Sequence, residues 1–197
     1  MSFRRSTIAL LAPLAALSLS ACGVNSVPTA EENAKAKWAN VQADYQRRAD
    51  LIPNLVETVK GFAKQEQGTL TAVVEARAKA TSVQLNAGDL SDPAKVAVFQ
   101  QAQGQLSGSL GRLLATVEAY PDLKSNANFL ALQSQLEGTE NRINISTKDY
   151  NEAVQSYNTT IRTFPDAIGA KIFYGAKPME TFKATAPNAD RAPTVKF

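Results

Sequence analysis

The pattern that decides the fold lies in residues 127–164, ANFLALQSQLEGTENRINISTKDYNEAVQSYNTTIRTF. A seven-residue repeat of apolar side chains keeps one side of an α-helix apolar, and here it is sustained over five intervals. Pro165 ends the pattern, because proline has no backbone N–H to donate. These residues therefore predict one long helix that packs lengthwise against others. The repeated positions are Phe129, Leu136, Ile143, Tyr150, Tyr157 and Phe164.

Two further helical arms precede this helix. Residues 92–120 begin with Asp92-Pro93, an N-cap residue followed by a proline in the first turn, and then carry apolar residues three and four apart. Residues 31–86 show the same spacing, which continues in phase across Pro53 and so predicts a kink there, with about four helices in three arms. We expect an all-α fold: an elongated antiparallel helical bundle with coiled-coil-like packing.

The N-terminal segment has the features of a cleaved signal. Arg4 and Arg5 precede a short apolar run, and Leu19-Ser20-Ala21-Cys22 resembles the lipobox of bacterial lipoproteins. We expect residues 1–21 to be a lipoprotein signal peptide and Cys22 to be the site of lipid attachment, carrying palmitate or similar acyl chains. Because two or more acyl chains anchor a protein stably, the partner predicted first is the membrane itself.

The remaining boundaries follow from composition. Residues 22–30 read as a tether, residues 31–183 as the bundle and residues 184–197 as a flexible tail. Within the bundle, residues 166–182 could either cover one end or form an exposed docking strip. The expected location is the bacterial cell envelope with the bundle outside the cytoplasm, and Gly23 after the cysteine favours the outer membrane if the source has one.

Composition excludes several classes of function. The chain has 197 residues, one cysteine and no histidine, which excludes Ser-His-Asp triads, His-ligated metal sites and an internal disulfide. The formal charge of +3 suggests nucleic acid, but removal of Arg4 and Arg5 leaves 19 basic against 18 acidic residues. We therefore expect no nucleic-acid partner, no cofactor and no enzymatic activity.

Five charged residues are candidates for a specific role: Arg47, Arg48, Asp50, Glu137 and Glu140. Arg48 falls on the apolar side of its helix, so its charge needs a partner, and we expect Glu140 or Glu137 of the facing helix to supply it and set the register. Two alternatives are a phosphate or lipid headgroup held by the two arginines, and a Ca²⁺ or Mg²⁺ site at the two glutamates.

A separate set of asparagines also recurs every seven residues, which we interpret mainly as the polar flank of the helix and alternatively as a register device. These are Asn144, Asn151 and Asn158.

Several stretches together resemble the LemA family. The resemblance covers roughly residues 38–173 and implies an antiparallel helical bundle held at a bacterial membrane, outside the cytoplasm. The association of the family with envelope proteases suggests envelope quality control or stress. Family members typically carry an uncleaved transmembrane helix, whereas a lipobox stands in its place here. The matching stretches are DYQRRADLIPNLVETVKGF (residues 44–62), Glu75-Ala76-Arg77, LLATVEAYPDLKSNANFLALQSQLEGTENRI (113–143) and YNEAVQSYNTTIRTFP (150–165).

Three hypotheses for function remain. The first is a lipid-anchored, non-enzymatic interaction module that binds an unidentified envelope protein. The second is a structural protein that self-assembles on the membrane surface. The third is an enzyme or metal binder that uses Glu137 and Glu140. The sequence does not determine the oligomeric state.

Overall fold

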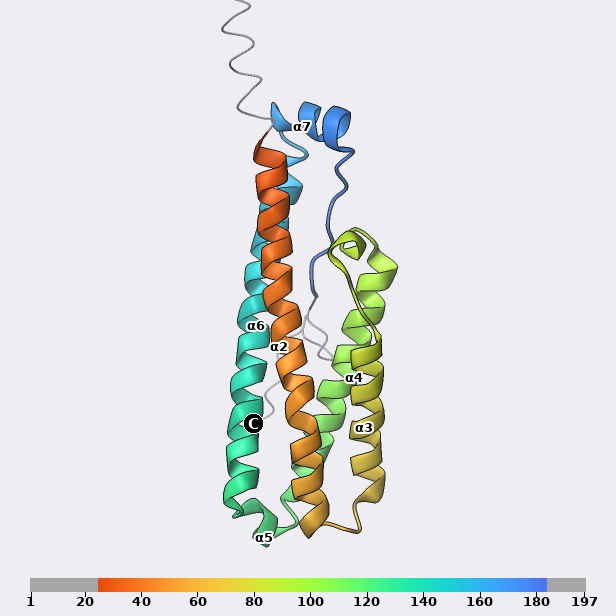
Figure 1. Ribbon diagram of the computed structural model, residues 1–197, viewed down its shortest axis with the longest axis vertical. Helices are drawn as coiled ribbons and strands as arrows, with labels where there is room; N and C mark the ends of the chain where they lie inside the picture. The colour runs from red at the N-terminus through yellow and green to blue at the C-terminus, as the bar shows by residue number, and fades with distance from the viewer. Residues whose placement is uncertain (1–24, 184–197) are drawn as a thin grey trace, which may run out of the picture.

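A computed structural model describes residues 25–183, and in this part of the chain all regular structure is helical. The expected all-α bundle is confirmed (Figure 1). Four helices are long: α2 (Ser26–Phe62), α3 (Gln67–Ser82), α4 (Pro93–Val117) and α6 (Ala127–Thr160). Four segments are short: η1 (Ala87–Asp89), α5 (Pro121–Lys124), α7 (Asp166–Gly169) and η2 (Ala170–Tyr174).

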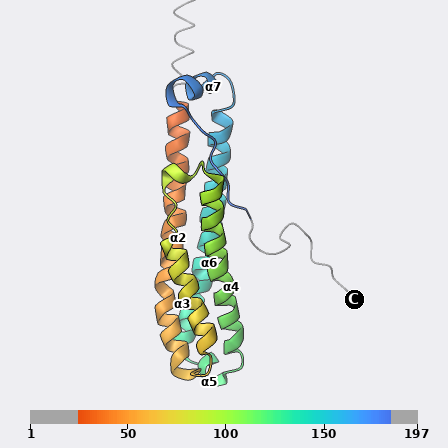
Figure 2. The same ribbon diagram turned by 90° about the vertical axis from the view of Figure 1, so that its right-hand side faces the viewer.

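The long helices pack as two antiparallel pairs. Helix α2 lies along α6, and α3 lies along α4 (Figures 1 and 2). The α2–α6 pair is longer, so at one end it extends beyond the α3–α4 pair. There the extended residues 175–183, here called the strap, run back along the pair in place of another helix.

The hydrophobic core has two parts, one at the end of the bundle that contains the strap and one at the opposite end. At the strap end it is aromatic: Trp38 contacts Phe99, Tyr150 and Phe182 at ring-centroid distances of 5.4–5.7 Å. At the other end it is mainly aliphatic, and all four long helices contribute buried residues to it, among them Leu113 of α4. Buried apolar area is the main source of stability in such a bundle, so the strap's Phe182 helps to hold the structure together.

The first arm consists of two helices, α2 and α3, and the break between them lies after Phe62, beyond the predicted kink at Pro53. Helix α2 continues through Pro53 and ends at Phe62, and the chain turns at residues 63–66. Proline removes the hydrogen bond that the Ala49 carbonyl would accept from residue 53. Arg77 of α3 supplies the missing donor, because its Nε donates to Ala49 O at 2.7 Å.

The bundle also starts earlier than predicted. Helix α2 begins at Ser26, so residues 26–30, expected to be a tether, are helical. Val27 is buried in the aromatic core, and Ser26 Oγ donates to Asp166 Oδ1 at 2.6 Å, which together fix the first turn. The predicted signal peptide, Cys22 and the C-terminal tail lie outside the described residues.

Residues 166–182 cover one end of the bundle, which is the first of the two roles considered for them. Helix α7 and η2 cover the end of the bundle, and Gly175 then adopts φ +54°, a left-handed conformation that favours glycine. This residue lets the chain turn back into the strap, where Met179 and Phe182 are buried. Within residues 25–183, no helix combines the length and apolar character needed to cross a membrane.

Candidate functional site

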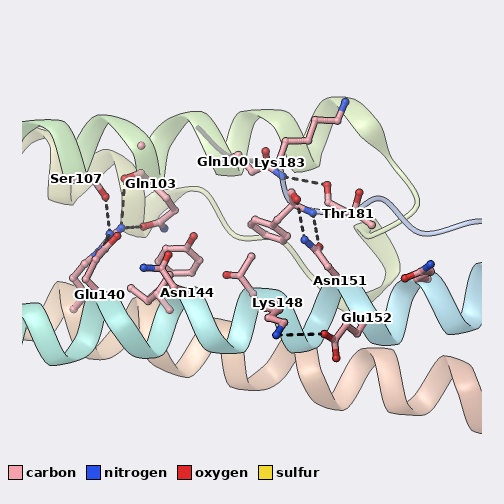
Figure 3. Close-up of a pocket in the computed structure, with 17 residues that line it drawn as sticks. Gln100, Gln103, Ser107, Glu140, Asn144, Lys148, Asn151, Glu152, Thr181 and Lys183 are labelled. Atoms are coloured by element: carbon pink, nitrogen blue, oxygen red, sulfur yellow. Dashed lines mark hydrogen bonds and ion pairs between the residues drawn. The ribbon is translucent and has the colours of Figure 1, made fainter. Parts of the chain in front are cut away.

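A groove of about 740 Å³ lies between α4 and α6, and the end of the strap, residues 181–183, forms part of its lining (Figure 3). Its floor includes Arg48 of α2, and its walls carry Gln103 and Ser107 of α4 and Glu140 and Asn144 of α6. Polar side chains therefore converge on it from three helices. Among the predicted candidates, Arg48 and Glu140 are here.

Arg48 is the centre of a buried polar network. Its Nη1 donates to Ser107 Oγ at 2.7 Å and to Glu140 Oε2 at 3.0 Å. Its Nη2 donates to Gln103 Oε1 at 2.8 Å, and Gln103 Nε2 in turn donates to Ala80 O at 3.3 Å. The predicted pairing of Arg48 with the facing helix is present, and Glu140 is the partner.

The environment explains how the arginine can be buried. Its side chain is 2% exposed while that of Glu140 is 49% exposed, so one member of the ion pair keeps much of its hydration. The guanidinium also lies 5.0 Å from the centre of the Tyr45 ring, within range for a cation–π interaction. Burial raises the pKa of Tyr45, and the charge of Arg48 partly opposes this.

The other predicted residues lie outside this network. Arg47 and Asp50 are exposed, and Asp50 accepts a hydrogen bond from Gln46 Nε2 at 2.7 Å. Glu137 is exposed and accepts from Gln133 Nε2 at 3.0 Å. The two arginines thus do not form a joint anion site. Nor do the two glutamates converge, and residues 25–183 contain no cluster of three or more side chains suited to a metal ion.

The asparagine repeat has a role that the sequence did not indicate. Asn151 Nδ2 donates to Phe182 O at 2.9 Å, and its Oδ1 accepts from Phe182 N at 2.8 Å. One heptad later, Asn158 Nδ2 donates to Met179 O at 2.8 Å and its Oδ1 accepts from Met179 N at 2.9 Å. Each amide thus holds both main-chain groups of one strap residue. The interpretation as a merely polar flank is wrong for these two residues.

Neighbouring groups complete this hold on the strap. Tyr150 and Tyr157, each one residue before an asparagine, donate their hydroxyls to the carbonyls of Glu180 and Lys177 at 3.0 and 3.1 Å. From the opposite side, Leu90 O accepts from Glu180 N at 2.8 Å. The strap backbone is therefore held much as a strand is held in a sheet, but largely by side chains. Its distance in sequence from α6 explains why no local pattern revealed this contact.

The repeat continues beyond the strap. Asn144 lies one heptad before Asn151, and its side chain extends from α6 into the groove (Figure 3). Its amide makes no hydrogen bond to any residue between 25 and 183, and the residue is exposed. The groove thus offers a third amide with the same chemistry as the two that hold the strap.

Comparison with known proteins gives the family. The family model described as LemA family matches residues 37–197. The chain belongs to the LemA family. This confirms the resemblance drawn from the sequence motifs, and the LemA family match includes the groove and the strap.

Curated relatives of this LemA family chain include proteins named for magnetosomes. Magnetosome protein MamQ 2 of Paramagnetospirillum magneticum is 27% identical over 80% of this chain and 64% of that protein. Magnetosome protein MamQ of Magnetospirillum gryphiswaldense is 27% identical over 72% of the chain and 58% of that protein. Protein LemA of Metamycoplasma hominis is 25% identical over 63% and 52%. The chain thus spans less than two thirds of the length of these relatives, whose names state no enzymatic activity.

Proposed function

We propose that this LemA family protein is anchored to the bacterial envelope by acyl chains on Cys22 and that its bundle binds extended polypeptide segments of envelope proteins, without catalysis. The lipobox-like Leu19-Ser20-Ala21-Cys22 supports the anchor. The relatives named as magnetosome proteins support a membrane location. The observation that carries the binding function is the hold of Asn151 and Asn158 on the strap backbone.

The chemistry of this hold suits a polypeptide of variable sequence. An asparagine amide has one donor side and one acceptor side, which match the C=O and N–H of one residue in an extended chain. Seven helical residues rise about 10.5 Å, and three extended residues span about 10 Å, so successive asparagines match every third residue of an extended chain. Because the main chain is common to all sequences, such a groove would accept unfolded segments. This preference fits a role in envelope quality control.

Asn144 provides the test of polypeptide binding. The probe is a reduced, alkylated and therefore unfolded model polypeptide carrying a fluorophore, titrated with the chain lacking residues 1–22 while anisotropy is followed. We expect Asn144→Ala to weaken binding about fivefold, since one amide clamp contributes on the order of 1 kcal/mol. The control is Asn141→Ala, an exposed asparagine on the same helix that does not line the groove.

Two results would contradict polypeptide binding. Equal affinity of the Asn144 and Asn141 variants would show that the groove is not used. Absence of binding by the chain both with and without residues 184–197 would show that the groove takes no polypeptide. Light scattering of the chain lacking residues 1–22 tests the alternative of self-assembly, which predicts large, concentration-dependent particles.

The anchor has its own test. With Cys22→Ser, we expect loss of palmitate labelling and a shift of the protein from the membrane fraction to the soluble fraction, because a protein without acyl chains lacks that anchor. Unchanged labelling would contradict the assignment of Cys22.

A further inference from the structure

Large apolar side chains are exposed at the end of the bundle where α2 begins. Phe164 is 82% exposed, Ile168 53%, and Ile172 and Phe173 68% each. We call these four residues the apolar cap. They belong to α7, η2 and the turn before α7, which together cover this end (Figures 1 and 2).

The local structure turns these side chains outward. In the same short segment the buried residues are Gly169 and Ala170, so the small residues face the bundle and the large ones face away from it. Burial of the large residues would have contributed more to folding. Exposed apolar residues gathered in one place are typical of a surface that contacts something else.

Charge and position indicate what this surface contacts. Arg162, Lys171 and Lys177 are exposed in the same region, whereas the carboxylate of Asp166 accepts from Ser26 Oγ. Apolar and aromatic side chains bordered by basic ones are typical of protein surfaces that lie in the interface of an anionic membrane.

The contact of Ser26 with Asp166 also places the cap close to the proposed anchor. It joins the first turn of α2 to α7 at 2.6 Å. Cys22 precedes Ser26 by four residues, which can span at most about 14 Å. Acyl chains on Cys22 would therefore enter the bilayer beside the cap.

We propose that the apolar cap inserts into the surface of an anionic lipid bilayer and so holds the elongated bundle end-on to the membrane. The position of the anchor rests on the proposed function, but the affinity of the cap for lipid does not require acylation. In this orientation the groove faces sideways, away from the lipid, where an extended polypeptide can reach it.

The test uses the chain of residues 22–197 with Cys22→Ser and vesicles of phosphatidylglycerol and phosphatidylcholine, with binding measured by co-sedimentation. We expect Ile172→Ser combined with Phe173→Ser to lower the partition coefficient at least about tenfold, because two large side chains no longer enter the interface. The matched control is Phe62→Ser combined with Leu130→Ser, which removes exposed apolar residues (45% and 49%) at the opposite end. The control should bind as the parent chain does.

Two results would overturn the proposal. One is equal vesicle binding by the cap variant and the control variant. The other is self-association without lipid that the cap substitutions abolish, since the cap would then be an interface between copies. Neither result bears on palmitate labelling of Cys22, so this proposal and the anchor can fail separately.

Discussion

Arg48 shows how a charge can occupy an apolar position of a helix. Three side-chain acceptors, on Gln103, Ser107 and Glu140, surround its guanidinium. The ion pair is asymmetric, because the arginine is almost fully buried and the glutamate is half-exposed. Removing the glutamate leaves a buried cation with less compensation, whereas the glutamate without its partner could still be hydrated.

We therefore expect Glu140→Gln to lower the free energy of unfolding by about 1–2 kcal/mol, measured by urea denaturation. Glu137→Gln, an exposed carboxylate on the same helix, should change it by less than about 0.5 kcal/mol. Equal effects would show that the Arg48–Glu140 pair contributes nothing. An Arg48→Met variant that stays stable and monodisperse and binds the unfolded polypeptide as tightly as the parent chain would contradict the proposed role in register.

At the scale of helices, one side chain explains why α2 is continuous. Pro53 leaves the carbonyl of Ala49 without its helical donor, and Arg77 of α3 fills that place at 2.7 Å. This contact also fixes α3 against α2, so one hydrogen bond both repairs a helix and joins two of them.

We expect Arg77→Met to cost about 1–2 kcal/mol of unfolding free energy in the parent chain and measurably less in a Pro53→Ala background. In that background the N–H of residue 53 can bond to Ala49 O, so the carbonyl no longer depends on the arginine. The control is Arg47→Met, an exposed arginine on α2. If Arg77→Met costs the same in both backgrounds, the arginine does not compensate for the proline.

At the scale of the whole molecule, the core contains tyrosines that must stay protonated. Burial raises the pKa values of Tyr150 and Tyr157, whose hydroxyls also donate to strap carbonyls. An unfolded chain ionises its tyrosines near pH 10, whereas the raised pKa values of these two keep them protonated to higher pH in the folded protein. Above that pH the unfolded state binds fewer protons, so stability is lost as the pH rises.

We expect urea midpoints to decrease steeply above about pH 10. Tyr157→Phe should flatten this decrease, although at pH 7 it costs the hydrogen bond to Lys177 O. An unchanged slope in this variant would mean that the buried hydroxyl does not contribute to the alkaline loss of stability.

Much of the architecture could be predicted because the spacing of apolar residues along one segment is enough to identify a helix. The seven-residue repeat from Phe129 to Tyr157 predicted α6, although the helix ends at Thr160 and the last repeat position, Phe164, is exposed. Asp92-Pro93 predicted the start of α4, where Asp92 Oδ1 accepts from Ala94 N and Lys95 N. Of the site, Arg48 was recognised because a charge on an apolar stripe requires a partner on the facing helix.

The sequence alone determined the all-α class, the LemA family membership and the need of Arg48 for a partner, because residue spacing and motifs along the chain reveal each of them. The tertiary structure decided where the first arm divides, how Pro53 is accommodated and what the asparagine repeat does. Each of these depends on contacts between distant residues, such as Arg77 with Ala49 and Asn158 with Met179. The strap is held through its main chain, so its side chains show no periodic pattern that the sequence could reveal. Only the folded chain brings the strap and α6 together.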